Sequence, residues 1–149
     1  MEKLEAVLLL VTACLIGALV GSAVTFAVMQ RAYSISNFAQ VKAVGVEVYV
    51  DPELTVPLRE ISWGSVEPGE SKTFTAYIQN AGNSPITLSL GTESWVPTNA
   101  SSMIQVSWNY SGKLVDAWQA VMVEFELRVD FAVSGIDTFS FTMVITGSG

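Results

Sequence analysis

One segment near the start of the chain consists of uncharged, mostly apolar residues. It covers 6–29, which is 24 residues without an Asp, Glu, Lys or Arg. As an α-helix it would extend about 36 Å, more than the ~30 Å hydrocarbon core of a bilayer. The sequence therefore predicts one transmembrane helix within residues 1–30, with the lipid bilayer as its partner.

After residue 44 the pattern changes to short segments in which apolar and polar residues alternate. A period of two is typical of strands with one buried face, and Gly, Pro and Asn clusters separate the segments. Seven such segments predict an all-β fold, a seven-stranded antiparallel β-sandwich over 44–149. The expected strands are 44–50, 58–63, 74–78, 86–90, 104–109, 121–131 and 139–145.

The strand expected at 121–131 has the clearest period of two. Its odd-numbered side chains are apolar and should face the core, whereas Glu124 and Glu126 should face solvent. By the same alternation Trp108 is predicted to lie in the core, as the central tryptophan of a sandwich does. The six predicted core residues of this strand are Val121, Val123, Phe125, Leu127, Val129 and Phe131.

Two turn-rich segments carry a resemblance to a known family. They are 63–72, WGSVEPGESK, in which Pro68 and Gly69 suit a type II turn, and 77–88, YIQNAGNSPITL. Their P-G-x-S…N-x-G-N-S-P-x-T-L pattern resembles that of immunoglobulin-like surface modules, including adhesion-type domains of archaea and bacteria. The chain also resembles short archaeal proteins with one amino-terminal membrane segment and one such domain. The resemblance, over about 44–146, implies an immunoglobulin-like sandwich and says little about activity.

The amino-terminal segment has two interpretations, a permanent anchor or a cleaved signal peptide. Residues 21–23, Gly-Ser-Ala, are an acceptable cleavage site, but the apolar run continues to Met29 and is longer than a cleaved segment needs. We therefore predict that the anchor is retained. Within it Ala13, Gly17, Gly21 and Thr25 recur every four residues and suit close helix packing, although small residues are common in membrane helices.

Two features of the sequence predict opposite orientations of the anchor. Basic residues, Lys3 on one side against Arg31 and Lys42 on the other, favour an amino terminus outside the cell. Two acceptor tripeptides for N-glycosylation, at Asn99 and Asn109, favour the β domain outside. We follow the second signal and predict a single-pass protein of the cell membrane with its β domain outside.

The segment 31–43 between anchor and sandwich is predicted to be a juxtamembrane connector. It contains neither Gly nor Pro, so the membrane helix could continue through it. Alternatively Ile35, Phe38 and Val41 belong to a segment that has no fixed partner in its own domain.

Composition excludes several classes of function. Histidine is absent, which removes the usual general base and metal ligand, and the one cysteine, Cys14, lies in the apolar run. From residue 43 onward, 12 acidic and 4 basic side chains give a net charge of −8, which disfavours nucleic acid. We expect no cofactor, and as protein partners the chain itself or another surface or membrane protein.

Candidate chemistry is sparse. Glu124 and Glu126 would lie roughly 7 Å apart on one strand face, a spacing also found in glycosidases, but an exposed strand face explains both charges. Acidic residues at strand ends could join loops through calcium, yet their spacing matches no EF-hand. These residues are Asp51, Glu53, Asp116, Asp130 and Asp137.

Aromatic residues near expected loops offer two readings. Trp63, Trp95 and Trp118, together with Tyr110, could bind sugars or a partner protein, or they could cap the ends of the sandwich. Capping is the interpretation that we favour, since each tryptophan would bury on the order of 200 Å² there.

Two functions follow from the sequence. The first is a membrane-anchored structural or binding module of the cell surface without catalytic activity. The second is an exported subunit of an extracellular filament, in which residues 34–43 complete the sheet of a neighbouring copy by strand addition after signal cleavage. An enzyme is not expected, for lack of a nucleophile and base pair.

Overall fold

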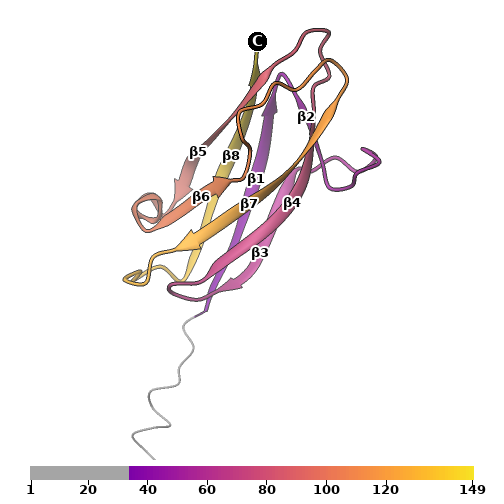
Figure 1. Cartoon of the computed structure of the whole chain (residues 1–149). Helices are drawn as coiled ribbons and strands as arrows, with labels where there is room; N and C mark the ends of the chain where they lie inside the picture. The colour runs from indigo at the N-terminus through magenta and orange to yellow at the C-terminus, as the bar shows by residue number, and fades with distance from the viewer. Residues whose placement is uncertain (1–33) are drawn as a thin grey trace, which may run out of the picture. The chain divides into compact units, whose positions relative to one another are not determined.

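A computed structural model of the chain describes residues 34–149, and these residues form an all-β sandwich (Figure 1). The predicted transmembrane helix and its stripe of small residues, from Ala13 to Thr25, lie outside the described residues. Within 34–149 no helix has the length and apolarity that crossing a bilayer requires.

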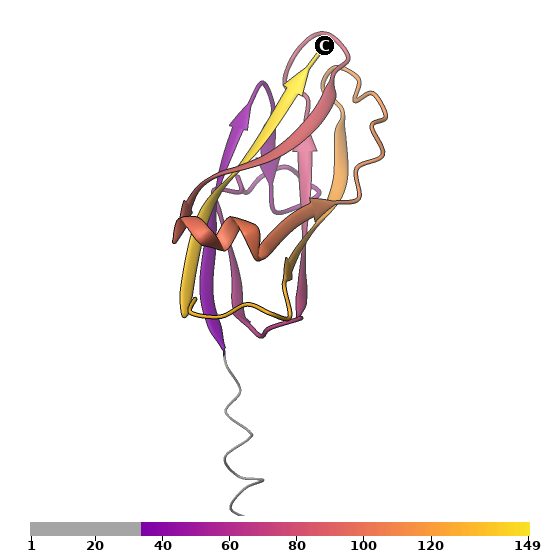
Figure 2. The same cartoon turned by 90° about the vertical axis from the view of Figure 1, so that its left-hand side faces the viewer.

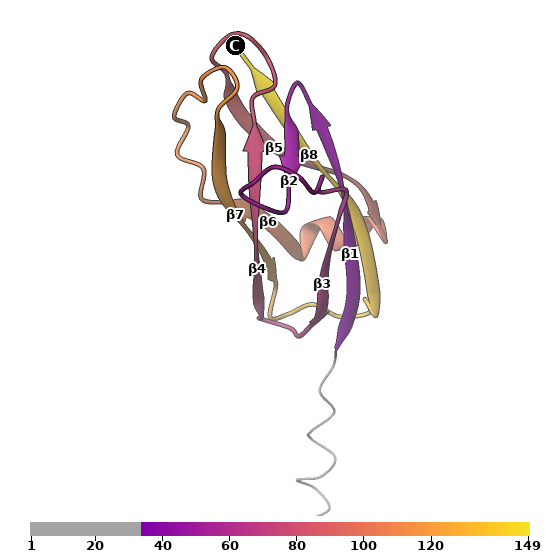
Figure 3. The same ribbon diagram turned by 90° about the vertical axis from the view of Figure 1, so that its right-hand side faces the viewer.

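The sandwich consists of two four-stranded sheets, here called sheet A and sheet B. Sheet A has the strand order β3-β1-β8-β5, and sheet B has the order β2-β4-β7-β6. A short 3-10 helix, η1 (Thr98–Ser102), connects the two sheets on one side (Figure 2), and the loop between β2 and β3 connects them on the other (Figure 3). The strands are β1 (Ile35–Val44), β2 (Glu47–Tyr49), β3 (Glu60–Val66), β4 (Ser71–Gln79), β5 (Thr87–Val96), β6 (Ile104–Trp108), β7 (Ala120–Val129) and β8 (Thr138–Ser148).

Strand β1 corrects the prediction of a connector over 31–43. It pairs in parallel with β8 and antiparallel with β3, so it lies inside sheet A. Ile35 and Ala39 are completely buried, and between them the Asn37 amide Nδ2 donates to the Gly64 carbonyl oxygen at 2.9 Å. The sandwich therefore has eight described strands rather than seven, and one of its pairs is parallel.

Strand β7 confirms the predicted alternation as far as Val129. Val123, Phe125 and Leu127 are completely buried, and the glutamates between them are exposed. The prediction for Phe131 is wrong, because this side chain is 83% exposed. The strand ends because Asp130 turns the chain: its Oδ1 accepts from the Ala132 amide at 2.7 Å, and its carbonyl oxygen accepts from the Val133 amide at 3.2 Å.

Several aromatic rings pack on one another in and beside the core. Trp108 is half-buried and stacks on Phe125 with ring centroids 5.8 Å apart, so it packs against the core but does not lie fully within it as predicted. Trp63 is buried in β3, not near a loop, and its ring makes a T-shaped contact with that of Phe74. Trp95 stacks on Phe141 at 4.3 Å between centroids.

Candidate functional site

A hollow of about 470 Å³ lies where the end of β7 meets the start of β6 and the turn between β3 and β4. This is the end of the sandwich at which β1 begins, since Ile35 pairs with Val66 and Ser36 pairs with Thr138 (Figure 1). The lining residues are Gly69, Ser102, Met103, Gln105, Arg128, Val129, Asp130 and Phe131.

The ring of Phe131 lies against the backbone of Gly69 at the edge of this hollow. A Cβ atom at position 69 would stand only 2.8 Å from Cδ2 of Phe131, which is closer than real Cβ contacts come. Gly69 also has φ +81°, a conformation that glycine adopts without strain. Position 69 therefore needs glycine for both the turn and the ring.

The turn that carries Gly69 is the one predicted from Pro68 and Gly69, and it is held by several polar contacts. The Glu70 amide donates to the Glu67 carbonyl oxygen at 3.0 Å, and Glu70 Oε2 accepts from the Glu67 amide at 2.8 Å. The hydrogen bond from Lys72, and then that from the Glu67 amide, lower the pKa of the Glu70 carboxyl below its ordinary value. The charged form of Glu70 thus supports the turn beneath Phe131.

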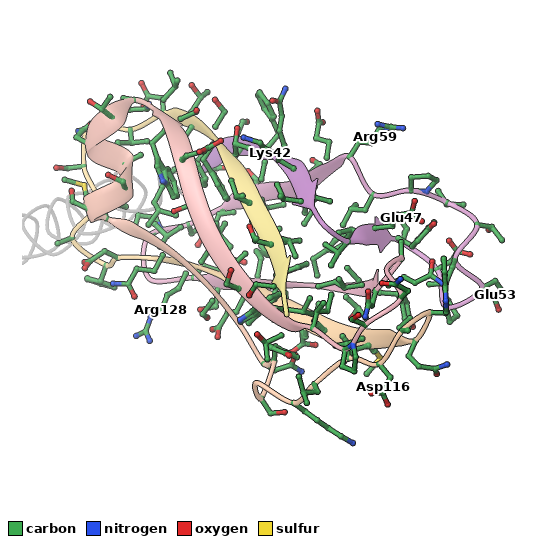
Figure 4. All side chains as sticks on the ribbon, turned by 90° about the horizontal axis from the view of Figure 1, so that it is seen from above. Lys42, Glu47, Glu53, Arg59, Asp116 and Arg128 are labelled. Atoms are coloured by element: carbon green, nitrogen blue, oxygen red, sulfur yellow. The ribbon has the colours of Figure 1, made fainter. Side chains whose placement is uncertain are left out.

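Three polar side chains from β6 and the end of β7 line the hollow. Gln105 and Arg128 are direct cross-strand partners, and Asp130 follows where β7 ends. Arg128 makes no ion pair within residues 34–149, where the two ion pairs are Lys42 with Glu93 and Lys72 with Glu70. Figure 4 shows its guanidinium extending away from the strands. The hollow thus presents a donor, an acceptor and an amide beside an exposed ring.

The structure does not bring the predicted acidic residues into a site. Glu124 and Glu126 lie on the exposed face of β7, across from Thr75 and Thr73 on β4, and neither lines the hollow. In the part of the chain that the structure describes, no three acidic side chains are placed to hold a metal ion. The arrangement of the described residues therefore gives no support for the calcium site considered from the sequence. The five acidic residues considered for it were Asp51, Glu53, Asp116, Asp130 and Asp137.

Asp51 shows what one of these acids does instead. Its carboxylate accepts from the Thr55 hydroxyl at 2.7 Å and from the Val56 amide at 2.7 Å, which fixes the loop between β2 and β3. Desolvation by burial would raise the pKa of Asp51, but the hydrogen bonds from Thr55 and Val56 outweigh it and lower the pKa. Asp51 is a loop-stabilising residue.

Both predicted glycosylation asparagines are exposed. Asn99 lies in η1. Asn109 follows β6, and its side-chain Oδ1 accepts from the Glu124 amide of β7 at 2.9 Å. This hydrogen bond adds a contact between the two strands just beyond the end of β6. Modification of the two asparagines stays a prediction.

The remaining aromatic candidates divide into packed and exposed residues. The Tyr110 hydroxyl donates to the Lys113 carbonyl oxygen and accepts from the Leu88 amide, so Tyr110 stabilises a loop. Trp118 is 63% exposed and has φ +64°, an unusual conformation for a bulky residue. Met122, on the outer face of sheet B, is also exposed, and it lies across from the half-buried Tyr77.

No protein-family model matches this chain, and no curated protein matches it. The geometry of the hollow and the sequence pattern must therefore support any functional conclusion.

Proposed function

We propose that this chain is a membrane-anchored, non-catalytic binding module whose sandwich lies outside the cell. The observation that carries the binding role is Phe131, a large apolar side chain that is 83% exposed and lines the hollow together with Gln105, Arg128 and Asp130. Aromatic side chains and arginine are enriched at recognition surfaces, so an exposed ring that lines a hollow together with Arg128 suits a binding role.

The anchor in this proposal is the uncharged run 6–29. Only residues 30–34 separate it from the start of β1, so the tether in the proposal is five residues long. The exposure of Asn99 and Asn109 supports the placement of the sandwich outside, because acceptor asparagines of N-glycosylation lie at accessible surface positions. The acidic composition of the domain favours its solubility in the aqueous phase outside the membrane.

We further propose that the sandwich is immunoglobulin-like and that the chain is related to the short archaeal membrane-anchored proteins that it resembles. Two face-to-face sheets of four strands within about 115 residues suit that class. The turn at Pro68 and Gly69, which belongs to the resemblance, has the expected positive φ at Gly69.

The filament alternative loses the donor strand that the sequence suggested for it. Residues 35–44 are β1 of their own sandwich, and this strand is already paired on both sides, with β3 and with β8. Donation of this strand would require removing Ile35 and Ala39 from the core. We therefore favour the anchored module.

Membrane extraction tests the anchored module. We expect the intact chain to stay with membranes washed in carbonate or high salt, because burial of 24 uncharged residues does not weaken with ionic strength. Mass spectrometry of peptides from the recovered protein should still detect residues 6–29. A mature chain that begins near Val24 would contradict the proposal and would favour the alternative, an exported filament subunit.

A further inference from the structure

The charges around the hollow indicate an uncharged ligand. Its lining has one cation, Arg128, and one anion, Asp130, so the site itself is balanced. The chain around it is acidic, with a net charge of −7. An anionic ligand would be repelled by this field on approach, and a polybasic ligand would meet Arg128 at the site.

The polar groups of the hollow call for a ligand that both donates and accepts hydrogen bonds. The Arg128 guanidinium only donates, the Asp130 carboxylate only accepts, and the Gln105 carboxamide does both. Asp130 Oδ1 is occupied by the Ala132 amide, whereas Oδ2 has no hydrogen-bond partner among residues 34–149. Hydroxyl groups, which donate and accept at one atom, can satisfy all three side chains.

The ring of Phe131 adds an apolar requirement. Gly69 supports the ring from one side, and the ring is otherwise exposed to solvent. A flat ligand surface made of C–H groups would cover it and remove its apolar area from water. Polyhydroxylated rings with one C–H face combine this property with the required hydroxyls.

We propose that the hollow beside Phe131 binds a neutral saccharide, with the sugar ring stacked on Phe131 and its hydroxyls bonded to Arg128, Asp130 and Gln105. The volume of about 470 Å³ lies within the usual range of ligand sites and exceeds that of one sugar ring. This inference rests on the proposed role as a binding module and names its ligand class.

Saccharide binding by the full chain tests the inference. The protein is kept in micelles of a phosphocholine detergent, because maltoside and glucoside detergents would themselves present the proposed ligand. Cellobiose, lactose and N,N′-diacetylchitobiose are titrated separately, and saturation-transfer NMR follows each sugar. We expect at least one disaccharide to bind with a dissociation constant of about 1 mM.

Two variants and a matched control locate the site. Phe131→Ala should weaken binding by about tenfold or more, as truncation of a central aromatic contact does. Arg128→Lys should weaken it about threefold, because lysine keeps the charge but loses the planar donor fork. The control is Phe38→Ala, which removes a phenylalanine that is 42% exposed on sheet A, and binding should stay within about twofold of the wild type.

Each contrary outcome has a defined meaning. Absence of binding by all three disaccharides, unchanged binding by Phe131→Ala, or an equal loss in Phe38→Ala would overturn the saccharide inference. An uncleaved, membrane-retained chain without saccharide binding would leave the proposed function in place. If the protein isolated from cells lacks residues 6–29 but still binds a saccharide, the proposed anchor is contradicted and the saccharide site is supported.

Discussion

Replacing Phe125 with alanine is expected to lower the free energy of unfolding by about 3–5 kcal/mol, the usual loss for a buried aromatic residue. The ring is completely buried on β7, stacks on Trp108 and is the cross-strand partner of Phe74. Typical domains are stable by about 5–15 kcal/mol, so this variant should be partly unfolded at moderate urea concentrations. Trp108→Ala should cost about 3 kcal/mol, the lower end of that range, because Trp108 is only half-buried.

Two conservative substitutions on the same strand are the controls. Glu124→Gln and Glu126→Gln should each change the free energy of unfolding by no more than ~0.5 kcal/mol, because both side chains are exposed. Urea unfolding of the full chain in micelles, followed by far-ultraviolet circular dichroism, compares the four variants. A large loss from either glutamate, or neutral behaviour of Phe125→Ala, would show that the two faces of β7 are assigned incorrectly.

The second large effect is expected from Ile35→Ala, which should destabilise the sandwich by about 2–5 kcal/mol. Ile35 is completely buried at the start of β1 and pairs with Val66 of β3. Its neighbour Ser36 is exposed, so Ser36→Ala should stay within about 0.5 kcal/mol of the wild type. The same urea titration measures both. Equal, small effects would mean that this segment is a loosely attached connector after all.

The sequence pattern missed β1 for a physical reason. The inward positions of β1 include an amide, Asn37, and a single methyl group, Ala39, whereas the outward Phe38 is apolar. The hydrophobic signal of a strand is therefore weak there, and the spacing of Ile35, Phe38 and Val41 suggests a helix instead. The backbone pairing with β8, which fixes the strand, depends on residues at the other end of the chain.

Glycines in the sequence predicted a turn correctly at one position and a strand end incorrectly at another. Gly69 has the positive φ that the predicted turn needs. The strand expected at 86–90 stops before Gly91, whereas β5 continues to Val96, and its irregularity lies between Glu93 and Val96. No atom lies within 4 Å of the position that a Cβ of Gly91 would occupy, so the absent side chain removes no packing contact there, and the pairing of Gly91 with Val144 of β8 continues the strand.

The candidate site could be predicted only in part. Phe131 continues the period of two on β7, so alternation alone places it in the core. One local signal pointed the other way: Asp130 is a residue type whose side chain often turns the chain by accepting from a backbone amide two residues on. The contact with Gly69 and the pairing of Arg128 with Gln105 depend on the packing and register of distant segments, which no local pattern specifies.

Protease treatment of intact cells, followed by the mass of whatever remains in the membrane, tests the anchored and outward-facing arrangement most directly. We expect loss of the sandwich and survival of an amino-terminal fragment that contains residues 6–29, because the bilayer protects a membrane-spanning helix. Recovery of the complete chain after treatment, with cell integrity verified by a cytoplasmic marker, would place the sandwich inside the cell. Absence of any fragment that contains residues 6–29 would show that the segment is removed during export.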